Sequence, residues 1–440
     1  MRIIGAAVSI VCLTMAVSVA EAQQPVRLTG PLSLLDAVRL GRERATSAIA
    51  AENNARAASA RVGQRRADLL PQIAGNASWN RQTINLEEFG LSSPGVPTVT
   101  PDFTVWRAQL TARQTVFDAS LLSRLWAARD NAGAAGLDAR SAAELSGAIA
   151  GLAYLRVLGA EETVRARLQD STVAASLLQQ ARRMVDAGVS PAIDATRSEV
   201  SFGAVRTQLE LSRNAVGRHR LDLAAALDLP AGTPLVLDDS LATPSLVLPE
   251  SADSAVAFAE LHRSERAAER LRTEAQRRTL SSIHQENLPS LGLAGMYQQS
   301  GQETGNLAGS YALQVGISVP ILDGFKRQTR AGEQQALLDL QLAREHQVER
   351  QVDIEVRQSL LDLASARDLM LIASDRVRLA DDELAQAQQR FESGVSGSVE
   401  TTQSQAASIL AHDAYIQARL AFAISRLGAY RALGVLDQLR

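Results

Sequence analysis

The side chains most able to carry out chemistry are spread thinly along this chain of 440 residues. The five histidines show no metal-ligand spacing, and the single cysteine, Cys12, lies near the start of the sequence. The sequence contains no GxxxxGK[ST], GxGxxG or GxSxG motif. We therefore expect no enzyme activity, no cofactor and no metal site. The histidines are His219, His262, His284, His346 and His412.

Two carboxylates, Asp194 and Glu400, occupy matching places in a motif that occurs twice. Residues 181–200 read ARRMVDAGVSPAIDATRSEV, and residues 387–406 read AQQRFESGVSGSVETTQSQA. In register, Gly188 coincides with Gly394, and each carboxylate follows its glycine by six residues. An acidic side chain in the first turn of a helix is stabilised by the helix dipole. Ordinary stabilisation is therefore one interpretation of this pair, and an acidic functional site is the other.

Long helices are predicted to position both motifs. Proline is absent from Asp102 to Ser190 and again after Pro320, and an interior proline costs a helix about 3 kcal/mol. Helices over residues 119–187 and 324–393 would each span roughly 100 Å. Gly188 and Gly394 are placed to end them in left-handed geometry. With Ser190 at the N-cap and Pro191 at the first helical position, a second helix then returns, so each motif is predicted to be the tip of a helical hairpin.

The N-terminus is typical of a secretion signal. Arg2 precedes an apolar stretch over residues 3–19, and Ala20-Glu21-Ala22 fits a cleavage site before Gln23. An uncleaved anchor is the alternative. The formal net charge of −3 gives no basic footprint for nucleic acid. We expect an exported protein.

Between the helices the hydrophobic period changes to two, which predicts four strands in two hairpins. The expected strands cover residues 72–80, 103–116, 290–298 and 308–319. One parity is apolar and carries aromatic residues close to the connecting loops, where a membrane interface would lie. A soluble sheet packed on the helices is the alternative to a membrane barrel. The interface aromatics are Trp79, Trp106, Tyr297 and Tyr311.

Four strands cannot close a barrel, and an open sheet edge in lipid leaves backbone groups unpaired. The smallest membrane barrels have eight strands. Several copies must therefore pool their strands, two copies giving eight and three giving twelve, and a lumen that fits cargo favours three.

The motifs repeat along the whole chain and divide it into two halves. We expect a signal peptide at 1–22, a first repeat at 23–230 with its tip at 188–191, a linker at 231–250, and a second repeat at 251–440 with its tip at 394–397.

The sequence resembles the TolC-like outer membrane efflux protein family. The likeness rests on LSLLDAVRLG at residues 32–41, the Leu-Pro strand starts, the Val-Phe-Asp and Ile-Leu-Asp strand exits, and the tips GVSPAIDATRSEV and GVSGSVETTQSQA. It implies a mainly α fold with a small β part. Three internally duplicated chains would share a twelve-stranded β-barrel in the bacterial outer membrane, continued by an α-barrel tunnel in the periplasm, with the 231–250 linker in an equatorial region.

The resemblance also implies partners and sites. The tips would dock onto a periplasmic adaptor that leads to an inner-membrane pump of the RND or ABC type. The implied docking residues are Gly188, Val189, Ser190, Pro191, Gly394, Val395, Ser396 and Gly397. A constriction just inside the tips would involve Asp194, Glu400, Phe391 and Gln403.

The chain departs from this family pattern at the constriction. Some members latch the gate with a tyrosine and an arginine, where this sequence has Phe391 and Ser396, and Gln403 replaces a further acidic residue. The predicted function is nevertheless a passive exit duct of a tripartite efflux or type I secretion system. A periplasmic adaptor and a coiled-coil structural protein are the alternatives, and the sequence does not indicate the cargo.

Overall fold

The computed structural model describes residues 30–91, 95, 97–238, 249, 251–303 and 306–436. The predicted signal peptide, with Cys12, and most of the predicted linker at 231–250 lie outside these residues.

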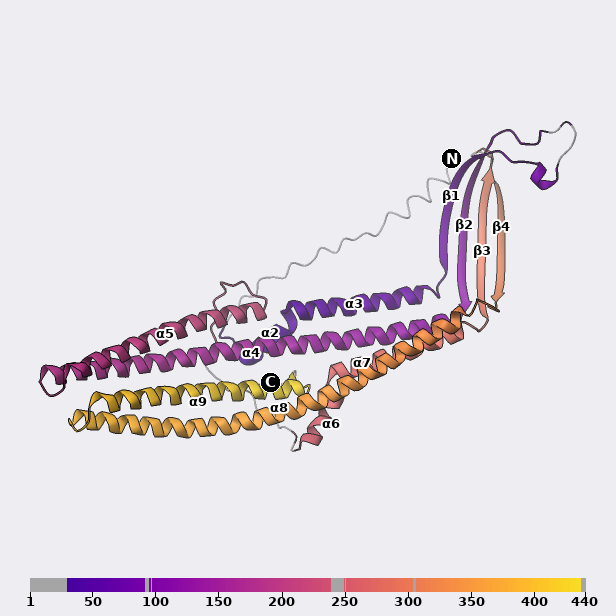
Figure 1. The fold of residues 1–440 in the computed structure, drawn as a ribbon. Helices are drawn as coiled ribbons and strands as arrows, with labels where there is room; N and C mark the ends of the chain where they lie inside the picture. Colours follow the sequence, from indigo (N-terminus) through magenta and orange to yellow (C-terminus); the bar gives the residue numbers. More distant parts are fainter. Residues whose placement is uncertain are drawn as a thin grey trace.

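The described chain consists of two sets of elements of the same kinds in the same order (Figure 1). The first set is α2 (Leu34–Arg44), α3 (Thr46–Ala67), β1 (Gln72–Gln82), β2 (Phe103–Phe117), α4 (Ala119–Asp186) and α5 (Ala192–Ala226). The second is α6 (Ala252–His262), α7 (Ser264–Gln285), β3 (Ser290–Gly301), β4 (Ala308–Ser318), α8 (Lys326–Glu392) and α9 (Ser398–Ala432). A 3-10 turn (Glu87–Phe89) lies in the β1–β2 connection.

Corresponding helices have almost the same length. Both α2 and α6 have 11 residues, and both α3 and α7 have 22. The long helices α4 and α8 have 68 and 67 residues, and α5 and α9 have 35 each. The predicted duplication, long helical hairpins and four antiparallel strands are therefore confirmed.

Local sequence explains where the long helices begin. Asp118 caps α4, because its carboxylate accepts hydrogen bonds from the backbone N–H groups of Ser120 and Leu121. At the matching place before α8, the Asp323 carboxylate accepts from the backbone N–H and the guanidinium of Arg327. Without proline after Asp118 or Asp323, each helix continues to its terminal glycine.

The helices and strands lie side by side in rows. In each row the elements of the first repeat are on one side, those of the second repeat are on the other, and the two repeats are in contact at the centre. Towards the tips the order is α5, α4, α9, α8, and near the sheet it is α3, α4, α7, α8 (Figure 1). The sheet has the order β1-β2-β3-β4, with all neighbours antiparallel. Each row therefore ends in one element of the first repeat and one of the second.

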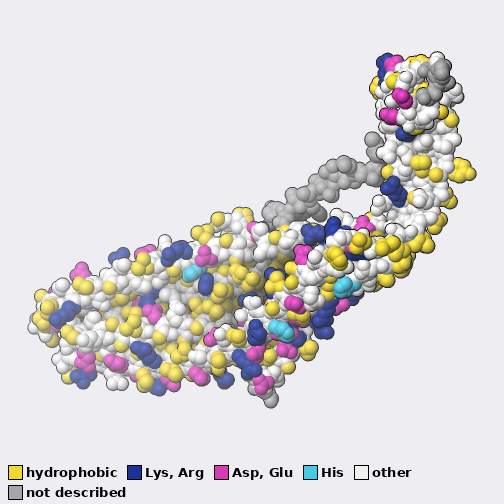
Figure 2. Space-filling view, turned by 45° about the vertical axis from the view of Figure 1, so that its right-hand side comes forward, with side chains coloured by type: hydrophobic (Ala, Val, Ile, Leu, Met, Phe, Trp, Pro, Cys, Tyr) yellow, Lys and Arg dark blue, Asp and Glu magenta, His cyan; other side chains and the backbone are white. Residues whose placement is uncertain are grey.

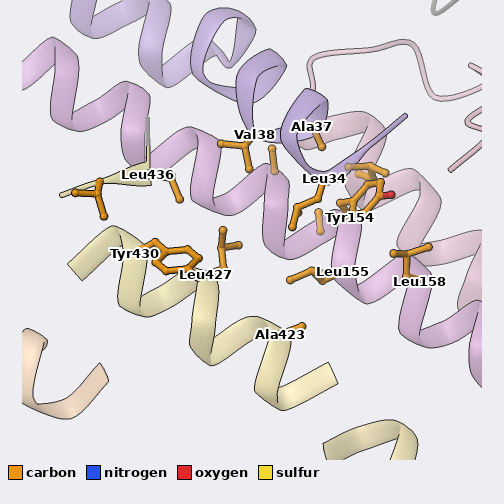
Figure 3. Packing of buried hydrophobic residues seen from close by; sticks show 14 of the residues in the cluster. Leu34, Ala37, Val38, Tyr154, Leu155, Leu158, Ala423, Leu427, Tyr430 and Leu436 are labelled. Carbon is orange, nitrogen blue, oxygen red and sulfur yellow. The ribbon is translucent and has the colours of Figure 1, made fainter. Parts of the chain in front are cut away.

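The main hydrophobic core lies where α2 and α9 pack on the middle of α4. Figure 3 shows Leu34 and Val38 of α2 on one side of α4, with Leu427 and Tyr430 of α9 on the other side. The Tyr154 hydroxyl donates to the Asp238 carbonyl oxygen at 2.9 Å, so this buried ring also holds the chain that follows α5. The core therefore joins the two repeats.

Glycines let α2 approach α4 very closely. A Cβ at Gly41 would lie 2.5 Å from the Ala150 Cβ and 2.9 Å from the Ser146 carbonyl oxygen. A Cβ at Gly147 would lie 2.9 Å from the Val38 carbonyl oxygen. Only glycine fits at such backbone-to-backbone contacts.

Among the described helices, α4 alone is long and apolar enough by composition to cross a membrane. Most of its apolar window is buried against other helices, as expected for the core helix just described.

Candidate functional site

The register of the sheet gathers the predicted aromatic residues in cross-strand pairs on one face. Trp79 lies opposite Trp106 and Tyr297 lies opposite Tyr311. The two tryptophan ring centroids are 6.4 Å apart with a tilt of 55°, a favourable aromatic geometry. The four side chains therefore form a ring segment near the loop end of the sheet.

The rest of this face is apolar and exposed. Its β4 residues include Leu313 and Ile317, each 73% exposed, and none of the described helices covers them. Figure 2 shows hydrophobic side chains exposed along the sheet and gathered where the helices reach it. The opposite face carries polar side chains such as Arg107, Gln109 and Arg113. A sheet that exposes an apolar face and turns a polar face the other way fits lipid outside and water inside.

Both edges of the sheet are open within one chain. Among the described strands, β1 pairs only with β2, and β4 pairs only with β3. Unpaired edge groups cost several kcal/mol each in lipid, so a membrane position requires strands from other copies.

The two hairpin tips have the same backbone geometry. Gly188 and Gly394 have φ of 71° and 73°. Val189 N–H bonds to the Met184 carbonyl at 2.9 Å, and Val395 N–H bonds to the Arg390 carbonyl at 3.0 Å. These bonds define Schellman C-caps, which explains the glycines.

The predicted N-cap of the first tip is wrong by one position. The N-cap of α5 is Pro191 rather than Ser190, and α9 begins after Gly397 without a side-chain cap. Both serines next to these caps bond to a different group, the Asp194 carboxylate, which competes for their hydroxyls.

Asp194 is buried at the contact between the two tips. Its Oδ2 accepts a hydrogen bond from the Ser190 hydroxyl at 2.5 Å, and its Oδ1 accepts from the Ser398 hydroxyl of α9 at 2.5 Å. The Arg197 guanidinium lies 3.6 Å from Oδ1. One carboxylate thus joins the first tip to the second.

The pKa of Asp194 is lowered by this environment. Burial alone would raise the pKa, but the hydrogen bonds from Ser190 and Ser398 and the charge of Arg197 outweigh it. Asp194 is therefore ionised at neutral pH.

The other predicted constriction residues lie in two different environments. Glu400 is half-exposed, and its carboxylate is 3.1 Å from the guanidinium Nε of Arg390 at the end of α8. Gln403 is exposed, whereas Phe391 is buried. Phe391 lines a small internal hollow with Leu177 of the first hairpin. The structure therefore buries Asp194 and Phe391 and leaves Glu400 and Gln403 nearer the surface.

The predicted docking residues are mostly exposed. Val189 and Val395 are 66% and 70% exposed at the ends of the two hairpins. Ser396 is only partly exposed, and its hydroxyl oxygen is buried without a hydrogen-bond partner.

Charged side chains also connect the two repeats above the tips. The guanidinium of Arg167 in α4 is buried and bonds to Asp170 at 2.7 Å and to Asp413 of α9. Arg419 of α9 bonds to Glu162 of α4 at 3.1 Å. Sequence reasoning missed these residues, because nothing in their spacing shows which helices become neighbours.

No group of three or more His, Cys, Asp or Glu side chains in the described ranges is arranged to hold a metal ion.

A model of a known protein family matches both repeats of this chain. The family model described as outer membrane efflux protein matches residues 40–228 and 259–435, one segment in each repeat. A search of curated proteins finds no match.

Solved structures share the fold at low identity. The outer-membrane channel OprN is 18% identical, with 91% of this chain and 89% of that chain covered and a TM-score of 0.79. The open-state MtrE outer membrane channel of Neisseria gonorrhoeae is 19% identical, with 96% of each chain covered and a TM-score of 0.78. The CmeC outer membrane channel of Campylobacter jejuni is 15% identical, with 92% and 86% covered and a TM-score of 0.76.

Proposed function

This chain belongs to the outer membrane efflux protein family, and on that premise we propose that it is the exit duct of a tripartite efflux or type I secretion system. It resides in the bacterial outer membrane and extends its helices into the periplasm. It supplies no energy itself, and an inner-membrane pump of the RND or ABC type loads the cargo.

The observation that carries this proposal is the open amphipathic sheet. Its apolar face is uncovered and its edges β1 and β4 are unpaired among the described strands. Three copies joined edge to edge would make a closed twelve-stranded barrel with the apolar face toward lipid. A soluble coiled-coil protein or a periplasmic adaptor has no use for such a sheet.

The hairpin tips are the proposed docking site for the periplasmic adaptor. Exposed Val189 and Val395 offer apolar contacts at the ends of both hairpins. Apolar side chains at the centre of a contact commonly supply most of its affinity.

The same region holds the proposed gate. Asp194 and Glu400 place carboxylates near the tip of each hairpin, and in a ring of three copies such charges favour cations and slow anions. Docking of the adaptor would move the hairpins apart, an interface-driven switch.

Single-channel recording in planar bilayers tests this function. We expect purified wild-type protein to form channels and the Asp194→Ala, Glu400→Ala double variant to have altered conductance and weaker cation selectivity. Unchanged conductance and selectivity would overturn the gate assignment. A soluble periplasmic monomer in cell fractionation would overturn the duct itself.

A further inference from the structure

The face of α8 that points away from α9 carries three regularly spaced aspartates. Asp368, Asp375 and Asp382 are exposed and recur every seven residues. Each follows by two residues an alanine buried in the hairpin, namely Ala366, Ala373 and Ala380. Two residues correspond to about 200° of helix rotation, so the aspartates leave α8 on the side opposite α9.

Apolar residues share this face with the aspartates. Leu361 and Leu371 are 71% and 54% exposed. Large apolar side chains interleaved with charge on an uncovered helix face are typical of a protein interface rather than of a solvated surface.

The helix at the other end of the row, α5, offers arginines with the same spacing. Arg206 and Arg213 are exposed and lie seven residues apart, each directly after a buried residue, Val205 or Ser212. Each guanidinium therefore starts from the flank of α5 and can extend past its outer side.

Within one chain these charged side chains form few ion pairs, and the pairs that they form are weak. In the described part of the chain, Asp368, Asp375 and Arg206 have no ion-pair partner, although Arg206 lies 5.7 Å from the Phe202 ring centroid. Arg213 pairs with Glu210 at 2.7 Å, and Asp382 lies 3.8 Å from Arg378. Both pairs join exposed neighbours on one helix, and such pairs contribute little stability.

The two sets of charges also lie at matching heights above the tips. The tips are level, because Asp194 near the start of α5 bonds to Ser398 at the start of α9. Arg206 and Arg213 lie 14 and 21 residues after Ala192, the first residue of α5. Asp382, Asp375 and Asp368 lie 10, 17 and 24 residues before Glu392, the last residue of α8.

Each arginine therefore falls midway between two aspartates. The offset of three to four residues corresponds to about 5 Å along the helix, which an arginine side chain can reach. We infer that α8 of one copy docks on α5 of the next copy through this alternating ladder of Asp382, Arg206, Asp375, Arg213 and Asp368. The inference rests on the proposed duct and names the contact that holds its copies in register.

The contact joins unlike surfaces, one from each repeat. The same polarity appears in the sheet, whose free edges are β1 and β4. Head-to-tail contacts of this kind join more than two copies, and they close into a ring when the rotation between neighbouring copies closes.

Charge reversal tests the ladder. We expect Asp375→Arg with Asp382→Arg to lower the trimer fraction about tenfold in native mass measurements at low salt, since each reversal turns an attractive contact into a repulsive one. Arg206→Asp with Arg213→Asp should do the same. Combining all four changes should restore the trimer, because the ladder is then rebuilt with its signs exchanged.

Cross-linking in an otherwise unchanged chain guards against misfolded variants. Once residues 1–22 are removed the chain has no cysteine, so Arg206→Cys with Asp375→Cys should give covalent trimers with a short bis-maleimide reagent. Arg206→Cys with Asp339→Cys is the matched control, since Asp339 lies 53 residues before the end of α8, and it should stay monomeric on denaturing gels.

The outcomes separate this inference from the proposed function. A wild-type chain that is monomeric in the outer membrane overturns the duct. A wild-type trimer that tolerates both reversals and gives no cross-link overturns only the ladder. Cross-linking of α8 to a different periplasmic protein also overturns the ladder.

Discussion

The Ser398 hydroxyl of the second hairpin donates a 2.5 Å hydrogen bond to the buried Asp194 carboxylate of the first. Among the described residues, this side-chain hydrogen bond between the two hairpins lies nearer the tips than the bonds of Arg167 and Arg419, so it resists separation of the tips.

Removing either partner should loosen the tips. A hydrogen bond to a charged group contributes about 1.5–3 kcal/mol, so Asp194→Ala and Ser398→Ala should each raise the frequency of spontaneous opening in bilayer recordings. The double variant should add little to Asp194→Ala, since one bond is lost in both. Ser393→Ala is the control, because its hydroxyl bonds to Gln389 within the same helix. Fully additive effects of Asp194→Ala and Ser398→Ala would contradict a direct bond.

Acid should release the same contact only well below neutral pH. The pKa of Asp194 is lowered from its ordinary 3.8, so its ionised form stabilises the folded tip above that value and the stabilisation is lost as the pH falls through the folded-state pKa. Hydrogen exchange of the tip peptides, corrected for intrinsic rates, should therefore be equal at pH 5 and pH 7 and rise only below about pH 4. Asp194→Asn should abolish the rise. A transition between pH 5 and 7 would exclude Asp194 as its cause.

The two faces of β4 should respond oppositely to a new charge. Leu313→Arg places a guanidinium in the middle of the apolar face, where it costs about 2–4 kcal/mol in a membrane barrel. Gln314→Arg makes the same change on the other face and should be tolerated. We expect the yield of heat-modifiable oligomer in outer membranes to fall for Leu313→Arg alone. Equal yields for the two variants would argue against lipid on the Leu313 face.

The close crossing of α2 and α4 should be intolerant of a single methyl group. Gly41→Ala would force its Cβ against Ala150 and the Ser146 carbonyl, and such overpacking costs about 1–3 kcal/mol. Gly136→Ala, in open space on α4, should instead stabilise the helix by about 0.5–1 kcal/mol. Thermal unfolding followed by tryptophan fluorescence should show a lower midpoint for Gly41→Ala and an equal or higher one for Gly136→Ala.

Local signals in the sequence were sufficient to predict the elements of the fold. The absence of proline predicts α4 and α8 because proline acts on the helix that contains it. Alternation predicts the face that holds Trp79 and Trp106, because side chains of a strand alternate by geometry alone. Gly188 and Gly394 mark the helix ends for a similarly local reason.

Contacts between distant segments could not be predicted in the same way. Asp194 matches Glu400 in sequence, yet Asp194 is buried and bonded to Ser398 while Glu400 pairs with Arg390 at the surface. Which member of a duplicated pair faces inward depends on how the repeats pack. The N-cap prediction at Ser190 failed for the same reason, because the Ser190 hydroxyl donates its hydrogen bond to the Asp194 carboxylate instead. The roles of Asp194, Glu400, Phe391 and Gln403 at a constriction stay predictions.

The nearly equal lengths of α4 and α8, and of α5 and α9, limit how this molecule can change in size. An insertion in one long helix would shift every side chain beyond it relative to the helices packed against it, which had not moved. A longer or shorter version of the molecule must therefore change α4, α5, α8 and α9 together. Steps of about seven residues would keep the buried residues of each helix on the same face.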